Sequence, residues 1–450
     1  MGGGDHVSRH RKRKGISVGT VIMLILTVVV AGGMFSILPR LMGQSSIAID
    51  ATQVLSALNL GDVLPELSLS EIPLGGGTQA SGEDVERIPQ PQQPVAQPTA
   101  QPTQAPTPTP VPGGTFTLTL GGSVNMDEGV RQSGYYSDAK SYDFSETLSL
   151  LRGEMQSDLT MVTLGNLVIP DAKVSALITP AQIMKTLADV GVDVVSLGFQ
   201  KAYDQGLSGL TATIGAARQA RLTTLGAYES AEDAAALHIV TLQGVPVALL
   251  HYTESLSSKG ASAMKKDGNS FAVPLLDIER VRADIAAARA QGAEVIIVSV
   301  DWTSTTKATP AKNQIAAAQQ IAEAGADVIV GTGTSVAQPV TWLTAGDRRV
   351  LCAYSLGSLL CDGRKDGNVA SLLLQLTITS DGMGGVSFDR VAYTPTYIWR
   401  YKLDGKYYYR VVASDKDAPM GMADDQAGYK DKAFANIRKL LGDDTPLTVR

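Results

Sequence analysis

The chain has 450 residues, of which 44% are hydrophobic, so it is long enough to bury a substantial core. Its 44 acidic and 38 basic residues give a formal net charge of −6. This negative balance argues against a nucleic-acid partner, because proteins that bind nucleic acids present strongly basic surfaces.

The first predicted element is a membrane anchor over residues 16–38, which contain no charged side chain. A helix of that length can cross the roughly 30 Å hydrocarbon core of a bilayer. Residues 1–15 form a basic stub with five bases and one acid, whereas Arg40 is the only base close to the other end. The positive-inside rule therefore predicts a single-pass protein of the cell membrane, with its amino terminus cytoplasmic and its remaining domain extracytoplasmic.

A cleaved signal peptide is the alternative to an uncleaved anchor. The apolar core of a signal peptide is usually shorter, about 7 to 15 residues, and a small-residue cleavage site should follow it. The sequence before the linker offers no convincing site of that kind. We therefore favour the anchor, which leaves a net charge of −10 on the residues after the stub, since the stub itself carries +4.

Two segments separate the anchor from the main domain. Residues 39–87 hold short apolar groups and a glycine run, which predict a partly ordered spacer. Residues 88–114 consist largely of Pro, Gln, Thr, Ala and Val, a composition that favours extended polyproline II and cannot form a core. This linker is expected to act as a stalk that holds the next domain away from the bilayer.

Residues 115–412 show alternating helix and strand patterns and form the predicted working domain. Three segments share one pattern, a helix closed by glycine and followed by an apolar strand: residues 180–190, 277–291 and 310–324. This repetition predicts an α/β domain in which helices cover a sheet.

The carboxyl-terminal part is predicted to contain a hairpin at Asp381-Gly382 and an aromatic strand over residues 406–412. Residues 413–450 form a tail with a possible short helix over residues 430–441. The chain's two cysteines, Cys352 and Cys361, could form one disulfide outside the cytoplasm or remain two buried thiols, because spacing does not determine their geometry.

In sheets of this kind the chemistry lies in loops just beyond the strand ends. Six such loops follow one another along the chain: residues 121–126, 158–166, 196–206, 298–302, 328–336 and 354–359.

The succession of these loops, together with the framework segments 325–331, 338–340, 354–357 and 393–397, resembles the CapA family, the poly-gamma-glutamate capsule synthesis domain. The resemblance covers about residues 115–412. It implies the fold of the calcineurin-like metallophosphoesterases, a helix-covered β-sandwich with α/β/β/α layers. It also implies work in a membrane complex that makes or exports an envelope polymer.

The polar residues of these motifs depart from the family pattern. In the first half of the domain, the family's Gly-Asp is replaced by Gly122-Ser123, its Asn-Leu-Glu by Thr163-Leu164-Gly165, and its Asn-Asn-His by Phe199-Gln200-Lys201. In the second half, His-Trp-Gly is replaced by Asp301-Trp302-Thr303, and Gly-His-His-Pro-His by Gly331-Thr332-Gly333-Thr334-Ser335. The asparagine of Ser-Leu-Gly-Asn is replaced by Ser358.

These replacements remove the side chains that a transition-metal centre needs, which are several imidazoles and carboxylates. The four histidines are His6 and His10 in the stub, His238, and His251, which we interpret as a packed or hydrogen-bonded surface group at a strand end. The sequence therefore predicts no metal and no other cofactor, and a pseudoenzyme is our hypothesis.

Ten residues of the former active site are candidates for binding a ligand: Ser123, Asn125, Asn166, Gln200, Lys201, Asp204, Asp301, Trp302, Thr332 and Ser335. Asp204 and Asp301 also have a purely structural interpretation, in which they cap a loop or form a salt bridge with Lys201.

The predicted function is a non-catalytic binding or scaffolding component of capsule or cell-envelope polymer synthesis or export. An acidic polymer such as poly-gamma-glutamate would be repelled by a net charge of −10 unless a local basic patch exists. The alternative is an active hydrolase or phosphodiesterase that uses Asp204, Asp301 and Lys201 without the family's metal centre, which fold alone does not exclude.

Overall fold

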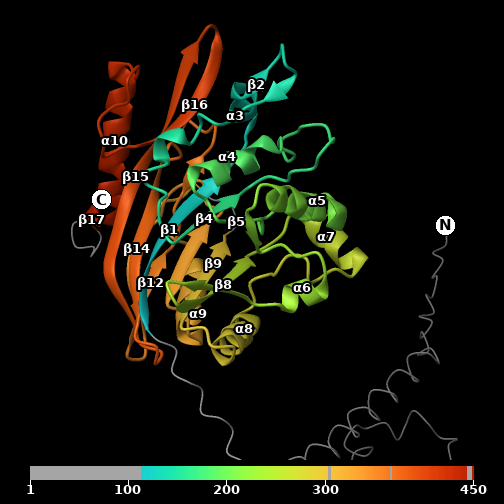
Figure 1. Ribbon diagram of the computed structural model, residues 1–450, viewed down its shortest axis with the longest axis vertical. Coiled ribbons are helices and arrows are strands. Elements are labelled where there is room, and N and C mark those ends of the chain that lie inside the picture. Colours follow the sequence, from blue (N-terminus) through green and yellow to red (C-terminus); the bar gives the residue numbers. More distant parts are fainter. Residues whose placement is uncertain (1–112, 303–305, 365–366, 443–447, 450) are drawn as a thin grey trace, which may run out of the picture. The chain divides into compact units, whose positions relative to one another are not determined.

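The computed structural model describes residues 113–302, 306–364, 367–442 and 448–449 (Figure 1). The predicted stub, anchor and spacer, and the linker up to residue 112, lie outside the described residues. Within the described ranges, no helix combines the length and the apolar character that a bilayer crossing requires.

Two β-sheets form the centre of the domain. The first sheet contains, in spatial order, β16 (Lys406–Ala413), β15 (Val386–Leu403), β14 (Ala370–Ser380), β1 (Gly114–Val124), β4 (Leu159–Leu164), β5 (Val194–Ser196) and β6 (Thr223–Leu225), with β13 (Ser358–Leu360) beside β1 and β17 (Thr448–Val449) beside β15. The second sheet contains β11 (Val340–Ala345), β12 (Arg348–Ala353), β10 (Val328–Thr332), β9 (Val295–Asp301), β8 (Val245–Thr253) and β7 (His238–Leu242).

The central strands of both sheets run parallel. β1, β4, β5 and β6 are parallel in the first sheet, and β8, β9, β10 and β12 are parallel in the second. Antiparallel strands complete the edges, among them the long β15–β16 hairpin. A separate small hairpin pairs β2 (Tyr135–Tyr136) with β3 (Ser141–Tyr142).

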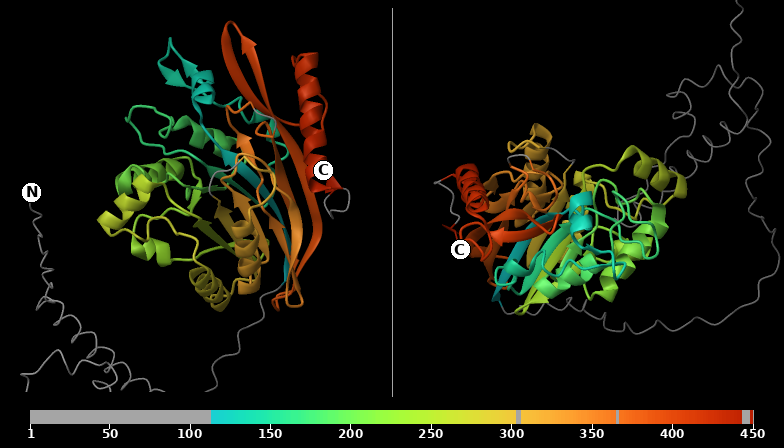
Figure 2. Two further views of the ribbon diagram at one scale, coloured as in Figure 1. Left: turned by 180° about the vertical axis from the view of Figure 1, so that it is seen from behind. Right: turned by 90° about the horizontal axis from the view of Figure 1, so that it is seen from above.

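Helices cover the outer faces of the two sheets (Figures 1 and 2). α3 (Glu128–Ser133), α4 (Gln182–Val190) and α5 (Gly206–Gln219) pack on the first sheet, together with the 3-10 turn η2 (Ser149–Leu151). α8 (Ile278–Ala290) and α9 (Lys312–Ala324) pack on the second sheet. The remaining helices are α6 (Ala231–Ala235), α7 (Ser258–Asp267) and α10 (Asp424–Leu441), the last of which packs along β15 and β14.

Strand alternation explains the layers. On β1, Leu118 and Leu120 point into the core between the sheets, where they meet Val247 of β8, Ile297 of β9 and Val328 of β10. The residues of opposite parity face the helices in two further cores. The described residues therefore form the mixed α/β, helix-covered sandwich that the sequence predicted.

The predicted helices agree closely with α4, α8 and α9. Gly191 and Gly325, which end α4 and α9, have left-handed φ angles of 107° and 117°. The short helix predicted over residues 430–441 is the second part of α10, which begins at Asp424. Asp424 and Asp425 favour the earlier start because acidic side chains stabilise the first turn of a helix.

The two cysteines are free and buried, in different parts of the interior. Cys352 lies in the core beneath α8 and α9, whereas Cys361 lies in the core of the first sheet. Of the two alternatives, the buried thiols are therefore present and the disulfide is not. Burial raises the pKa of the Cys361 thiol to about 11, so it is not a thiolate near neutral pH.

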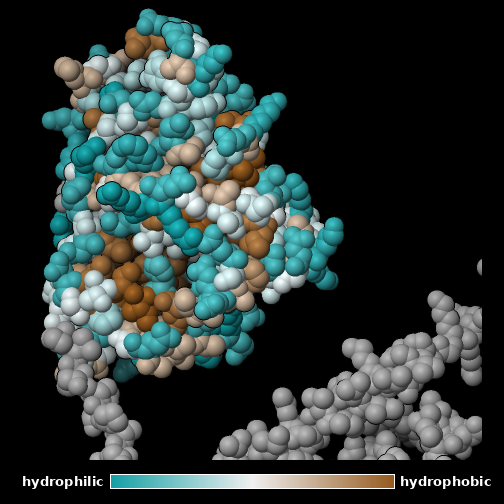
Figure 3. All heavy atoms as spheres, turned by 45° about the vertical axis from the view of Figure 1, so that its right-hand side comes forward, coloured by the Kyte–Doolittle hydropathy of each residue, from teal (hydrophilic) through white to brown (hydrophobic). Residues whose placement is uncertain are grey.

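Most of the surface seen in Figure 3 is hydrophilic, and the largest apolar area in that view lies near the end where β1 begins.

Candidate functional site

The inner faces of both sheets change from apolar to polar at the carboxyl ends of the parallel strands. The positions that continue the inward-facing series are Thr163 on β4, Ser196 on β5, His251 on β8, Ser299 and Asp301 on β9, and Thr332 on β10. Thr163 Oγ1 donates to Thr332 Oγ1 at 3.3 Å and so joins the two sheets. The sandwich core thus ends in a polar layer at the edge where such folds bind ligands.

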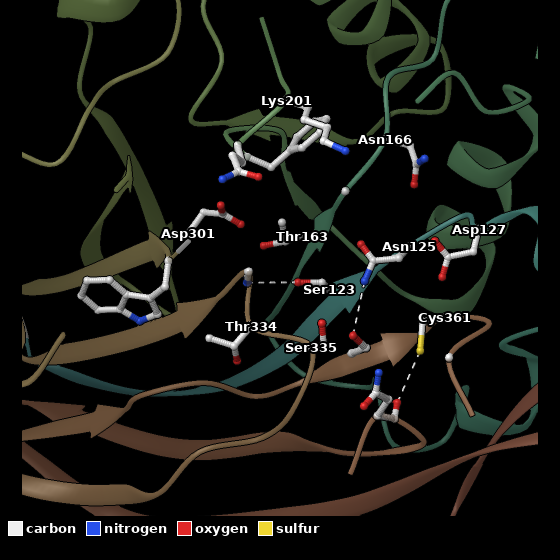
Figure 4. A pocket seen from close by; sticks show the side chains of 18 of the residues that line it. Ser123, Asn125, Asp127, Thr163, Asn166, Lys201, Asp301, Thr334, Ser335 and Cys361 are labelled. Atoms are coloured by element: carbon white, nitrogen blue, oxygen red, sulfur yellow. Dashed lines mark hydrogen bonds between the residues drawn. The ribbon is translucent and has the colours of Figure 1, made fainter. Parts of the chain in front are cut away.

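A cleft of about 320 Å³ opens above this layer. Eight of the ten predicted residues line it: Ser123, Asn125, Asn166, Gln200, Lys201, Asp301, Trp302 and Ser335. Figure 4 shows Asp301 on one side, Asn125 and Asp127 on the other, Ser123 and Thr163 between them, and Lys201 and Asn166 above. Residues separated by more than 200 positions in the sequence therefore converge on one cavity.

The structure places the other two predicted residues outside the cleft lining. Asp204 accepts a hydrogen bond from the Ser257 hydroxyl, which itself caps α7 by accepting from Gly260 N at 3.0 Å. Thr332 is 2% exposed and its hydroxyl meets Thr163 below the cleft. Asp204 thus has the loop-capping role that was its structural interpretation.

A break in the register of β1 places Ser123 and Asn125 in the cleft. The pairing of β1 with β4 shifts between Leu120 and Ser123, and Ser123 N donates to Gly357 O at 3.0 Å. A Cβ on Gly122 would lie 2.1 Å from that carbonyl oxygen, so this close approach requires glycine. Asn125 Nδ2 then donates to Ser358 Oγ at 3.3 Å across the cleft wall.

Two of the lining side chains also hold the cleft together. Asn166 Oδ1 accepts from Met126 N at 2.7 Å, and its Nδ2 donates to Ala176 O at 3.2 Å. Trp302 is 1% exposed and its Nε1 donates to Tyr354 O at 2.9 Å. These polar groups already have hydrogen-bond partners within the protein, so the other lining side chains must make most of the contacts to a ligand.

Asp301 is the most perturbed acid of the cleft. Burial raises the pKa of its carboxyl to about 8, while a hydrogen bond from Gln200 N lowers it and the nearby Glu254 raises it. The side chain is only 3% exposed. Asp301 is therefore mainly protonated at neutral pH, and it can donate a hydrogen bond as a neutral group.

His251 is hydrogen-bonded, as predicted, but it is only 2% exposed, so its predicted place at the surface is wrong. The reason is that β8 continues to Thr253, which places His251 inside the strand on its inward face. Its Nε2 lies 2.7 Å from Gly198 O and its Nδ1 2.7 Å from Ser196 Oγ and 3.1 Å from Ser299 Oγ. Since a carbonyl only accepts, Nε2 carries the proton and Nδ1 accepts from the hydroxyls.

We expect His251→Leu to lower the free energy of unfolding by about 2–4 kcal/mol, because buried polar partners are left unsatisfied. Burial lowers the pKa of His251 to about 4, below its ordinary value of 6.5. The stability it contributes is therefore present above pH 6.5 and is lost as the pH falls towards 4. Denaturant titration of the full chain in neutral detergent at pH 7.5 and pH 5 measures both effects. A leucine variant as stable as the wild type would contradict this role.

A family model described as "Bacterial capsule synthesis protein PGA_cap" matches residues 117–363. The chain belongs to this family. The matched range contains every residue that lines the cleft except Asn368.

Two curated relatives are similar over part of their length. The chain is 26% identical over 201 residues to "Capsule biosynthesis protein CapA" of Bacillus anthracis, covering 45% of this chain and 48% of that protein. It is 28% identical over 207 residues to "PGA biosynthesis protein CapA" of Bacillus subtilis (strain 168), covering 46% of this chain and 52% of that protein. The chain thus spans about half the length of these relatives.

Among solved structures, the calcineurin-like phosphoesterase YfkN of Bacillus subtilis is similar with 13% sequence identity and a TM-score of 0.37. The match covers 73% of this chain and 99% of that one.

The cleft residues do not fit the transition-metal centre that the sequence resemblance implied for this family. Among the residues that the structure describes, no three His, Cys, Asp or Glu side chains gather closely enough to hold a metal ion. The nearest donors are otherwise engaged, since Asp301 accepts a hydrogen bond from Gln200 N and both nitrogens of His251 have partners. Asp127 Oδ2 accepts from Asp362 N at 3.0 Å. Hydroxyls and amides make up most of the remaining donors, and transition metals bind them poorly.

Several lining residues were absent from the predicted set, among them Asp127, Thr163, Thr334, Ser358, Cys361 and Asn368. Asp127 follows the loop after β1 by one residue, so extending that loop would have included it. Burial raises the pKa of its carboxyl, against the lowering effect of the Asp362 N–H. Asn368 carries no comparable signal, because it lies beyond β13 and reaches the cleft only through the tertiary fold.

Proposed function

We propose that this protein is a non-catalytic binding component of capsule or envelope polymer synthesis or export, held at the membrane by residues 16–38. The observation that carries the proposal is the lining of the cleft, where hydroxyls, amides and one lysine predominate and where Asp127, Asp301 and Cys361 do not gather into a metal site among the described residues. The names of the two curated relatives, which refer to capsule and PGA biosynthesis, support the polymer class.

The chemistry of the cleft suits a ligand that carries a carboxylate. Lys201 is exposed on the cleft wall, and among the described residues no carboxylate lies within ion-pairing distance of it. Protonated Asp301 and the amides of Asn125 and Gln200 add neutral donors. A volume of about 320 Å³ is at the lower end for a small-molecule site and suits a unit such as one or two glutamyl residues.

The same groups are poorly arranged for hydrolysis. A general base must be unprotonated and must reach the nucleophile, whereas Asp301 holds its proton at neutral pH. Asp204, one of three residues on which the hydrolase alternative rests, bonds to Ser257 outside the lining. The raised pKa of Asp301 remains the one observation that favours the alternative, since a neutral carboxylic acid can protonate a leaving group.

The full chain purified in neutral detergent tests the proposal. We expect no stoichiometric transition metal and no turnover of phosphodiester or γ-glutamyl substrates, together with binding of a γ-glutamyl dipeptide by calorimetry. Lys201→Gln should weaken that binding at least about tenfold, which corresponds to 1.4 kcal/mol for a charge-assisted contact.

The matched control is Lys265→Gln, which removes an exposed lysine from α7. It should leave dipeptide binding unchanged. Bound metal at one equivalent, with turnover abolished by Asp301→Asn, would overturn the non-catalytic function and establish the hydrolase.

A further inference from the structure

A row of cations lies against tyrosine rings on one face of the β15–β16 hairpin. The Arg364 guanidinium is 5.8 Å from the Tyr409 ring centroid, and that of Arg400 is 4.7 Å from the Tyr407 centroid. Lys402 Nζ is 5.6 Å from the same Tyr407 ring. We call Arg364, Arg400 and Lys402, with Tyr407 and Tyr409, the basic ladder.

The basic ladder is continuous with the cleft. Gly363 lines the cleft, and Arg364 follows it directly. Arg400 lies opposite Tyr409 in the strand register and hydrogen-bonds to it, and Lys402 lies opposite Tyr407, so these four side chains share one face. Arg400 and Lys402 are two residues apart, roughly 6.6 Å along an extended strand. The ladder therefore leads from the cleft rim towards the tip of the hairpin.

The cations of the ladder are held but not neutralised. Within the described residues, none of the three has a carboxylate within 4.0 Å, whereas Arg410 on the neighbouring strand β16 pairs with Glu146 at 2.6 Å. Arg364 donates to Ile398 O, and burial and the neighbouring Arg400 lower its pKa. A ring face positions a cation without cancelling its charge. Two arginines thus lie near one another, and no carboxylate of the part of the chain that the structure describes pairs with either.

Among the described residues, two acids at the cleft end of the ladder already accept hydrogen bonds, and a third lies at the hairpin tip. At the cleft end, Asp362 Oδ2 accepts from Gly129 N at 2.8 Å, and Asp127 accepts from Asp362 N. Asp404 is exposed in the turn at the tip. The opposite face of the hairpin has its own cation, Lys406, which lies 4.7 Å from the Tyr136 ring and 5.1 Å from the Tyr408 ring.

We propose that the basic ladder binds an extended polycarboxylate chain whose terminal unit occupies the cleft. This inference rests on the proposed function, because the cleft must accept a carboxylate-bearing unit for the ladder to continue the contact. It also supplies the local basic patch that an acidic polymer needs on a protein of negative net charge. Contact with the tyrosine rings restricts the cationic side chains before binding, so less entropy is lost when the polymer binds.

The test compares a long and a short ligand. The full chain in neutral detergent is titrated with a γ-linked glutamate oligomer of about ten residues and with the dipeptide. We expect Arg400→Gln/Lys402→Gln to weaken oligomer binding about tenfold or more and to leave dipeptide binding unchanged. The affinity of the oligomer relative to that of the dipeptide should fall sharply between 0.05 and 0.5 M salt (roughly 13 to 4 Å Debye lengths), because exposed charges are screened.

Two control variants remove cations that lie outside the basic ladder. Lys265→Gln/Lys266→Gln removes two exposed lysines from α7, and Lys406→Gln removes the cation from the other face of the same hairpin. Both should bind the oligomer like the wild type. If Arg400→Gln/Lys402→Gln binds the oligomer as tightly as the wild type, the inference is overturned. If the wild-type protein does not bind the dipeptide, the proposed function is overturned instead.

Two further probes identify the source of the carboxylates. A hyaluronan fragment bound with the same sensitivity to Arg400→Gln/Lys402→Gln supports the shared chemistry with an acidic sugar chain as ligand. Ladder-dependent association with nanodiscs that contain phosphatidylglycerol, without binding of either polycarboxylate, would show a membrane contact and overturn the inference.

Discussion

Asp301→Asn is expected to raise the free energy of unfolding by roughly 5 kcal/mol at pH 7.5 and by slightly more at pH 8. The carboxyl is 3% exposed, and burial raises its pKa to about 8 from an ordinary value of 3.8. Above pH 4 the unfolded chain releases this proton freely, whereas the folded chain retains it. Each pH unit of that difference corresponds to about 1.4 kcal/mol, and asparagine reproduces the neutral form without this penalty.

The pH dependence has a defined sign and window. The stability that comes from Asp301 is complete below pH 4 and is lost as the pH rises towards 8. The stability that comes from His251 has the opposite pH dependence, because it is lost as the pH falls from 6.5 to 4. The two therefore offset one another in the acidic range, and the loss caused by Asp301 alone should appear between pH 6.5 and 8.

Denaturant titrations of the full chain at half-unit steps from pH 5 to pH 8.5 measure this profile. Asp404→Asn, which changes an exposed acid at the hairpin tip, is the matched control and should follow the wild-type curve. If Asp301→Asn runs parallel to the wild type above pH 6.5, Asp301 is ionised in the fold, and its proposed role as a neutral donor fails.

The sequence predicted the cleft because strand ends in a parallel sheet meet at one edge. Ser123 and Asp301 lie in the last positions of β1 and β9, Ser335 follows β10, and the fold brings them together as the strand-end rule requires. The same rule does not decide which way each side chain points. Thr332 is the last residue of β10 and faces Thr163, and His251 belongs to a strand that extends two residues beyond it.

Other features depend on contacts between segments that local pattern does not pair. The aromatic strand around Tyr407 and Tyr409 was predicted, but its relation to Arg364 arises from the packing of β16 near the segment that follows β13. Similarly, Asp204 has the residue type and spacing of a site residue, yet its partner Ser257 lies 53 positions away. Such pairings are set by tertiary structure.

Restoring four family residues at once is expected to create a transition-metal site. Ser123, Lys201, Asp301 and Ser335 occupy positions where the family's motifs carry aspartate, histidine, histidine and histidine, and all four line the same cleft. Ser123→Asp/Lys201→His/Asp301→His/Ser335→His should therefore bind one Co²⁺ at least about 100-fold more tightly than the wild type. Imidazole and carboxylate ligands favour first-row metals far more than hydroxyls do.

Cobalt absorption in the visible range reports both affinity and geometry, independently of any activity. The control changes three exposed lysines, Lys185, Lys265 and Lys266, to histidine, and so adds the same number of imidazoles without converging them. If the fourfold variant binds no more Co²⁺ than this control, the four positions do not share one centre, and the cleft cannot be the family's former metal site. If it binds one equivalent, the loss of metal ligands in this chain is a matter of side chains alone, because the scaffold that positioned them is still present.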